Sequence, residues 1–126
     1  MIVLRGRFQM LDHKSKFIEI LKIELLDLEQ DIKQIIDEYT DKHDHEVISN
    51  YVFQENLALG QRELFGIDGF TQDVHGFNLE AVDSVESLVS ALKELLSRRV
   101  TSNGLPKAIE LLVNRKIDKV VQYINH

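Results

Sequence analysis

Cysteine and tryptophan are absent from the 126-residue sequence, and proline occurs once. Without thiols the chain can form neither a disulfide nor a Cys-ligated zinc or iron–sulfur site. No apolar run approaches the roughly 20 residues that a membrane-spanning helix needs. The first residues also lack the long apolar segment and cleavage site of a secretory signal. We therefore expect a soluble cytoplasmic protein with no membrane partner.

Acidic residues outnumber basic ones, 21 to 15, and the net charge of −6 argues against nucleic-acid binding. The charge is uneven, because residues 1–18 and 93–126 carry net charges of +3 and +4, whereas residues 19–46 and 47–92 carry −7 and −6. The favoured interpretation is that a basic last helix lies beside an acidic first one. The alternative is a basic face that meets an acidic partner protein, formed by Arg98, Arg99, Arg115, Lys116 and Lys119.

The clearest helical pattern covers Phe17–Tyr39. Its apolar and aromatic seam recurs at alternating steps of three and four, at Ile18, Leu21, Leu25, Leu28, Ile32, Ile35 and Tyr39. At 100° per residue, Ile20, Ile23 and Leu26 point away from this seam. A helix that is apolar on two sides either sits centrally in the fold or meets another subunit. We predict the second, a homodimer whose interface includes Ile20, Ile23 and Leu26.

Three further helices are expected. The second covers Lys42–Phe65, with Thr40 and the following aspartate as candidate N-caps, and the third covers Leu79–Arg99. An Asn-Gly pair at 103–104 predicts the end of the third helix. Pro106 suits the first turn of a fourth helix that continues to the C-terminus.

The segment Gly66–Asn78 shows no helical spacing and contains three of the six glycines. We expect it to be a long loop between the second and third helices, with room for a crossover between them. Residues 1–11 are interpreted as an N-terminal arm in which Ile2, Val3 and Leu4 could form a short strand. The predicted fold is therefore all-α, an antiparallel four-helix bundle in a single domain, residues 1–126.

No motif predicts a catalytic, metal or cofactor site. The sequence contains no Glu-x-x-His, Gly-x-Gly-x-x-Gly, P-loop or His-Glu-x-x-His string. His43 and His45 lie among acidic residues, but on a helix they point about 200° apart and chelate together only if the backbone there is not helical. We therefore expect a solvated turn at these histidines and predict no metal, no cofactor and no catalytic residue.

Two charged residues, Glu55 and Arg62, fall in the middle of the apolar face of the second helix, close to Tyr51. Burying an unpaired charge is costly, so we expect both to be buried and each to have a partner. The favoured interpretation is an interhelical ion pair, or long side chains that reach water from the edge of the face. The alternative is a small-ligand pocket gated by the predicted loop and lined by Tyr51, Glu55, Arg62, Asp68 and His75.

These observations leave two classes of function. The favoured class is a protein-interaction or regulatory module, a homodimer that acts through a partner protein. The alternative is a small-ligand-binding or enzymatic bundle that uses the polar pocket. A closed pocket touching Glu55 and Arg62 would favour the ligand-binding class, whereas an open apolar face would favour the interaction module.

Overall fold

The chain forms four long helices in the computed structural model, which describes the backbone of residues 2–125 and the side chains of residues 13–125. In chain order the elements are α1 (Ile2–Asp44), α2 (Asn50–His75), the 3-10 helix η1 (Leu79–Ala81), α3 (Val85–Ser102) and α4 (Lys107–Asn125). The described residues contain no strand, which confirms the predicted all-α class.

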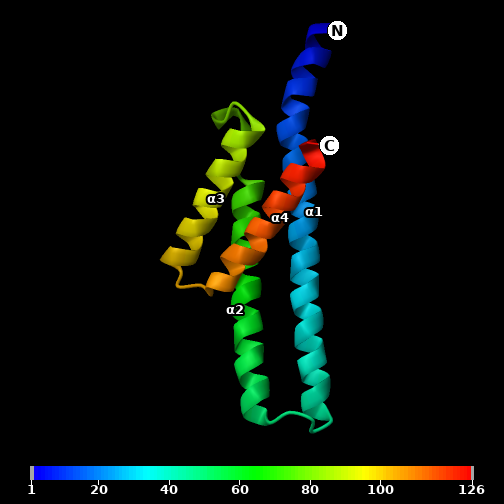
Figure 1. Cartoon of the computed structure of the whole chain (residues 1–126), viewed down its shortest axis with the longest axis vertical. Coiled ribbons are helices and arrows are strands. Elements are labelled where there is room, and N and C mark those ends of the chain that lie inside the picture. The colour runs from blue at the N-terminus through cyan, green and yellow to red at the C-terminus, as the bar shows by residue number, and fades with distance from the viewer. Residues whose placement is uncertain (1, 126) are drawn as a thin grey trace.

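The four helices form two antiparallel hairpins of unequal length (Figure 1). The long hairpin is α1 with α2, joined by the turn at residues 45–49, and the short hairpin is α3 with α4. The short hairpin packs on the half of the long one that lies away from this turn, with α4 against α1 and α3 against α2. We call the other half of the long hairpin, residues 33–59, the distal half.

Seventeen apolar side chains are buried in one core, where all four helices meet. Burial of each such side chain contributes about 1.5–3 kcal/mol relative to an exposed position. In contrast, no residue of the distal half is fully buried. The core residues are Phe17, Ile18, Leu21, Leu25, Leu28 and Ile32 of α1, Ile67, Phe70 and Val74 of α2, Leu88, Leu92, Leu96 and Val100 of α3, and Ile109, Val113, Ile117 and Val120 of α4.

Helix α1 is longer than predicted at both ends. It begins at Ile2, so the interpretation of residues 2–11 as an arm with a strand is wrong, and residue 1 lies outside the described residues. At the other end it continues through Thr40 to Asp44, and the Thr40 hydroxyl donates to the carbonyl of Ile36 inside the same helix. Thr40 is therefore not the N-cap of the next helix. That role belongs to Ser49, whose side chain accepts from the N–H of Val52.

The loop predicted over Gly66–Asn78 is wrong for most of its length, because α2 continues to His75. Ile67, Phe70 and Val74 follow one another at steps of three and four and are buried in the core. Two of the three glycines that suggested a loop, Gly66 and Gly69, are packing positions in this helix, and the third, Gly76, is its C-cap. The actual connection, residues 76–84, is short and leads α3 back beside α2 without a crossover.

The ends of α3 show one wrong boundary and one confirmed stop signal. The helix begins at Val85 and not at Leu79, because Ser84 caps it by accepting from the N–H of Ser87. Gly104 has a φ of 58°, the left-handed conformation that favours glycine after a helix. The chain then turns through Pro106 into α4, as the sequence predicts.

Candidate functional site: a groove in the distal half of the long hairpin

A groove of about 320 Å³ runs between α1 and α2 where the short hairpin no longer covers them. Leu112 of α4 forms one end of it. Figure 1 shows α4 crossing the long hairpin above this region and leaving its lower part free. We call this surface the distal groove, and its walls are formed by Asp31, Ile35 and Tyr39 of α1 and by Asn56, Leu59 and Glu63 of α2.

Helices α1 and α2 approach closely at Gly60, which lines the distal groove. A Cβ atom built on Gly60 would lie 2.9 Å from Cδ1 and Cγ1 of Ile36, so glycine lets Ile36 pack here without shifting. A glycine inside a helix costs about 1 kcal/mol relative to alanine. At this position the cost is offset by close packing of Ile36, which forms the floor of the distal groove together with Ile32.

Apolar side chains line both walls of the distal groove and remain open to solvent. Ile35 on α1 is 51% exposed and Leu59 on α2 is 46% exposed. The predicted seam of α1 is thus buried through Ile32 but not at Ile35. An α-helix drifts about 20° per heptad from a strict seven-residue repeat, and α4 does not extend over this part of α1. Contiguous exposed apolar surface of this kind is typical of interaction sites.

Carboxylates lie on both walls of the distal groove. Asp31 is exposed, whereas Glu63 is partly buried, and this burial raises the pKa of Glu63. Among the described side chains, neither Asp31 nor Glu63 has a salt-bridge partner. The stretch that contains the groove, residues 28–63, carries nine acidic and only three basic side chains. The distal groove is therefore apolar along its length and negatively charged along its edges.

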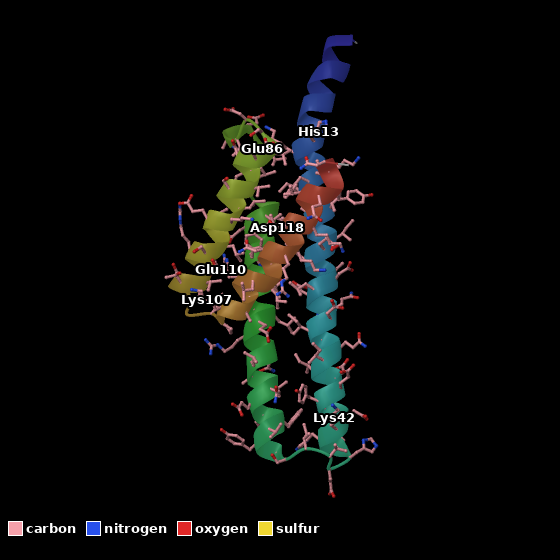
Figure 2. The ribbon with its side chains drawn as sticks, viewed as in Figure 1. His13, Lys42, Glu86, Lys107, Glu110 and Asp118 are labelled. Carbon is pink, nitrogen blue, oxygen red and sulfur yellow. The ribbon has the colours of Figure 1, made fainter. Side chains whose placement is uncertain are left out.

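Aromatic contacts lie at the end of the hairpin that is next to the turn. The Nζ atom of Lys42 lies 5.7 Å from the centre of the Tyr39 ring, within the range of a cation–π contact. The rings of His43 and Phe53 stack with their centres 4.3 Å apart. Figure 2 places Lys42 at this end of the hairpin, far from Lys107 at the start of α4. The distal groove thus lies between an aromatic cluster and the first turns of α4.

Tyr51, Glu55 and Arg62 are all exposed, so the prediction that Glu55 and Arg62 are buried is wrong. The helical wheel placed them correctly on one face of α2, but no helix covers that face between Tyr51 and Arg62. Glu55 and Arg62 border a shallow depression with Ala58 and Leu59. The guanidinium of Arg62 donates to the carbonyl of Gly104, so its partner is backbone and not a buried acid.

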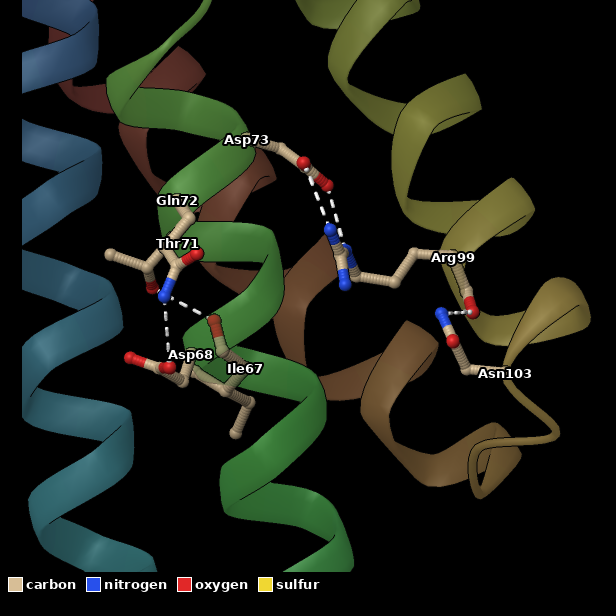
Figure 3. Close-up of polar contacts among 7 residues, drawn as sticks. All are labelled: Ile67, Asp68, Thr71, Gln72, Asp73, Arg99 and Asn103. Carbon is tan, nitrogen blue, oxygen red and sulfur yellow. Dashed lines mark hydrogen bonds and ion pairs between the residues drawn. The ribbon is translucent and has the colours of Figure 1, made fainter.

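Asp68 and His75 belong to α2 and not to a gating loop. Asp68 is exposed and accepts a hydrogen bond of 3.2 Å from the side-chain amide of Gln72, one turn later in the helix (Figure 3). His75, the last residue of α2, is also exposed. It borders a hollow on α1 that is distinct from the depression at Glu55 and Arg62. The structure therefore does not bring the five predicted ligand-binding residues together.

The predicted interface residues of α1 divide into two kinds. Ile20 is partly buried and packs against the core of its own chain. Ile23 and Leu26 are 59% and 53% exposed and line the hollow beside His75. Leu26 and Leu28 lie two residues apart, so this apolar surface is on roughly the opposite side of α1 from the distal groove.

The basic residues of the last two helices mostly pair with acids of the same chain. The guanidinium of Arg99 donates to both carboxylate oxygens of Asp73, at 2.7 and 3.0 Å (Figure 3). Lys116 and Lys119 lie 3.3 and 2.8 Å from Oε1 of Glu24 on α1. These contacts confirm the favoured interpretation, in which a basic last helix lies beside an acidic first one.

No set of three or more potential metal-binding side chains gathers in the part of the chain that the structure describes. The ring of His43 stacks on Phe53, while Nδ1 of His45 lies 2.8 Å from the carbonyl oxygen of Asp41. This contact with Asp41 raises the pKa of His45. Over the same described residues, no helix is both long and apolar enough to cross a membrane.

The residues that matter most in the distal groove were not identified as a site from the sequence. Ile35 was assigned to the apolar seam of the first helix, whereas Asp31, Leu59 and Glu63 were not singled out. One signal was present: the excess of acidic over basic residues between 28 and 63 coincides with a continuous apolar seam. That combination is expected where an apolar surface binds something of opposite charge.

Comparison with known proteins gives no match at any level. No protein-family model, no curated protein and no solved structure matches the chain.

Proposed function

We propose that the protein is a protein-interaction module that binds a helical segment of a partner in the distal groove. The observation that carries this proposal is the open apolar surface between α1 and α2, with Ile35 and Leu59 exposed on opposite walls. A helix laid into an apolar groove between two other helices is a common mode of peptide recognition. Such a helix buries side chains at helical spacing against the floor formed by Ile36 and Ile32.

A second surface supports self-association of this module. Ile23 and Leu26 form an exposed apolar patch on the other side of α1. Because this patch and the distal groove lie on different sides of α1, a homodimer through Ile23 and Leu26 leaves both grooves free. The proposed module is therefore a homodimer with two binding sites.

A small-ligand site at Glu55 and Arg62 is the alternative function. It has less support, because both side chains are exposed around a shallow depression and Arg62 is held by the Gly104 carbonyl.

Site-specific photo-crosslinking in cells that produce the protein tests the interaction function. A photoreactive amino acid at Leu59 should give a discrete adduct of higher mass, which the second substitution Ile35→Glu should abolish. The matched control is the same photoreactive residue at Leu111, a leucine of α4 that is 60% exposed and does not line the groove. Equal adducts at both positions, or no adduct at Leu59, would contradict the proposal.

A further inference from the structure

Acidic residues follow one stripe of α1 at heptad spacing. Glu24, Asp31 and Glu38 are seven residues apart, and residues at this spacing share one side of a helix. The first of them lies under α4, the second lines the distal groove, and the third continues toward the hairpin turn. The same stripe therefore passes from the covered half of the hairpin into the open half.

Helix α4 shows what this stripe binds in the covered half. It carries four basic and two acidic side chains and buries one side completely, at Ile109, Val113, Ile117 and Val120. Two of its lysines, Lys116 and Lys119, place their ammonium groups on Glu24. The lysines lower the pKa of Glu24, with the hydrogen bond from Lys119 as the largest cause. Helix α4 is thus an amphipathic cationic helix seated on an acidic, apolar hairpin.

The distal groove likewise combines an apolar surface with carboxylates, but no helix of the described chain lies on it. Asp31 corresponds to Glu24 by heptad position, and Glu63 faces the groove from the other wall. Glu63 is partly withdrawn from water without a salt-bridge partner among the described side chains. A carboxylate in this state gains more from a cation than a fully solvated one does, because its charge is less screened.

The length of the groove sets the size of its occupant. From Leu28 to Tyr39 the groove follows α1 over twelve residues, which span about 17 Å or three helical turns. A helix of roughly three to four turns therefore spans the groove from Leu112 to the aromatic end.

We infer that the partner segment is a cationic amphipathic helix of another protein, with lysine or arginine beside its apolar stripe and placed against Asp31 and Glu63. This inference rests on the proposed function and specifies its partner. The segment repeats, in the distal groove, the way that α4 docks on the covered half. An acidic or uncharged helix of equal apolar area binds more weakly, because it leaves Glu63 partly desolvated and unpaired.

Binding of designed peptides to the full-length protein tests this inference by fluorescence anisotropy. The first probe is a labelled 14-residue peptide, a length of about four turns, with leucine at every third or fourth position and lysine beside this stripe. The second probe has glutamine in place of every lysine. We expect the lysine peptide to bind about tenfold more tightly than the glutamine peptide, the effect of two partly exposed charge pairs.

Two pairs of substitutions locate this charge effect. D31N with E63Q should weaken binding of the lysine peptide about tenfold and leave the glutamine peptide unchanged. The control D37N with E86Q removes the same net charge at exposed positions outside the groove and should change neither affinity. If the control weakens the lysine peptide as much as D31N with E63Q does, the attraction is a general charge effect and the inference is wrong.

A third variant separates this inference from the proposed function. L59D should abolish binding of both peptides, and circular dichroism should show unchanged folding because Leu59 is on the surface. If both peptides bind equally and both are lost in L59D, the groove binds helices but the cationic partner is wrong. If neither peptide binds, the proposed function fails as well. Self-association that is lost in L59D would mean that a second copy fills the groove, and would also overturn the inference.

Discussion

Glu24 is the residue at which the basic fourth helix holds the acidic first helix. Its carboxylate is largely buried and accepts hydrogen bonds from Lys116 and Lys119. These contacts lower the pKa of Glu24 below its ordinary value. A carboxyl group with a lowered pKa in the folded state stabilises the fold at neutral pH. That contribution is lost as the pH falls through the folded-state pKa.

Glu24→Gln should therefore destabilise the protein by about 1 kcal/mol at pH 7, the scale of a partly solvated charged hydrogen bond. The deficit relative to wild type should shrink as the pH is lowered below the ordinary glutamate value of about 4.3. Urea unfolding monitored by circular dichroism between pH 7 and pH 3 measures this difference in the free energy of unfolding. Asp37→Asn, at an exposed carboxylate, is the control and should be neutral throughout. If the loss of stability in Glu24→Gln stays constant with pH, the charge of Glu24 is not its cause, and the different shape of the glutamine side chain is.

For single residues, the sequence predicted which way a side chain points better than it predicted what surrounds that side chain. Helical geometry placed Glu55 and Arg62 on one face of α2, as the structure has them. It could not show that α4 begins too far along the hairpin to cover that face. Burial depends on the neighbouring helix, whose position follows from the packing of Ile109 and Val113 in the core.

Gly66 allows the close crossing of α2 and α4. A Cβ atom at Gly66 would lie 2.7 Å from Cδ1 of Ile109 and 2.9 Å from Cδ1 of Leu105. Ile109 is fully buried, so it has no free space to move into. Gly66 therefore sets how closely the short hairpin can approach the long one.

Gly66→Ala should lower the free energy of unfolding by about 1 kcal/mol. Overpacking costs about 1–3 kcal/mol, whereas alanine returns about 1 kcal/mol of helix propensity. Gly60→Ala is the matched variant, since its Cβ would meet the partly exposed Ile36, which can shift toward solvent. Its net effect should be close to zero. Thermal unfolding of both variants checks that Gly66→Ala is the less stable one. If Gly66→Ala is more stable than Gly60→Ala, Gly66 is not needed for a close crossing of α2 and α4.

Helix boundaries were predictable where a seam was clear and stop signals were present. The seam from Ile18 to Ile32 and the stop at 103–104 are confirmed. Gly66–Asn78 was misassigned because a glycine has the same local signature in a loop and at a helix crossing. The helical spacing of Ile67, Phe70 and Val74 distinguished the two cases. This repeat has only three members, so the glycines around it obscured it.

Among the described side chains, the apolar patch at Ile23 and Leu26 lies apart from the distal groove, and it predicts self-association of the whole molecule. Ile23→Glu should convert a wild-type dimer into a monomer at tens of micromolar in sedimentation equilibrium, because a charge in the centre of an apolar interface is left unpaired. Leu111→Glu, at an equally exposed leucine of α4, should leave the dimer intact. A wild type that is monomeric under these conditions would rule out the dimer.

The arrangement of the molecule could be predicted only in part. Four amphipathic stretches with short connections favour neighbouring antiparallel helices, which is what Figure 1 shows. The unequal length of the two hairpins could not be read from the sequence, because the apolar seam of α1 continues past Ile32 whether or not a third helix covers it. The distal groove is a consequence of that inequality and so became visible only in the structure.

The position of α4 in the chain also affects how the protein is made. Helix α4 follows the other three helices in the sequence, yet its Ile109, Val113, Ile117 and Val120 are wholly enclosed against helices made before it. At a synthesis rate of 5–20 residues per second, residues 76–125 take about 3–10 seconds to make. Until α4 has been made, the part of the α1–α2 seam that it covers has no partner in α4. Newly made chains therefore pass through a stage at which a chaperone that binds apolar segments has the same surface to hold that α4 later occupies.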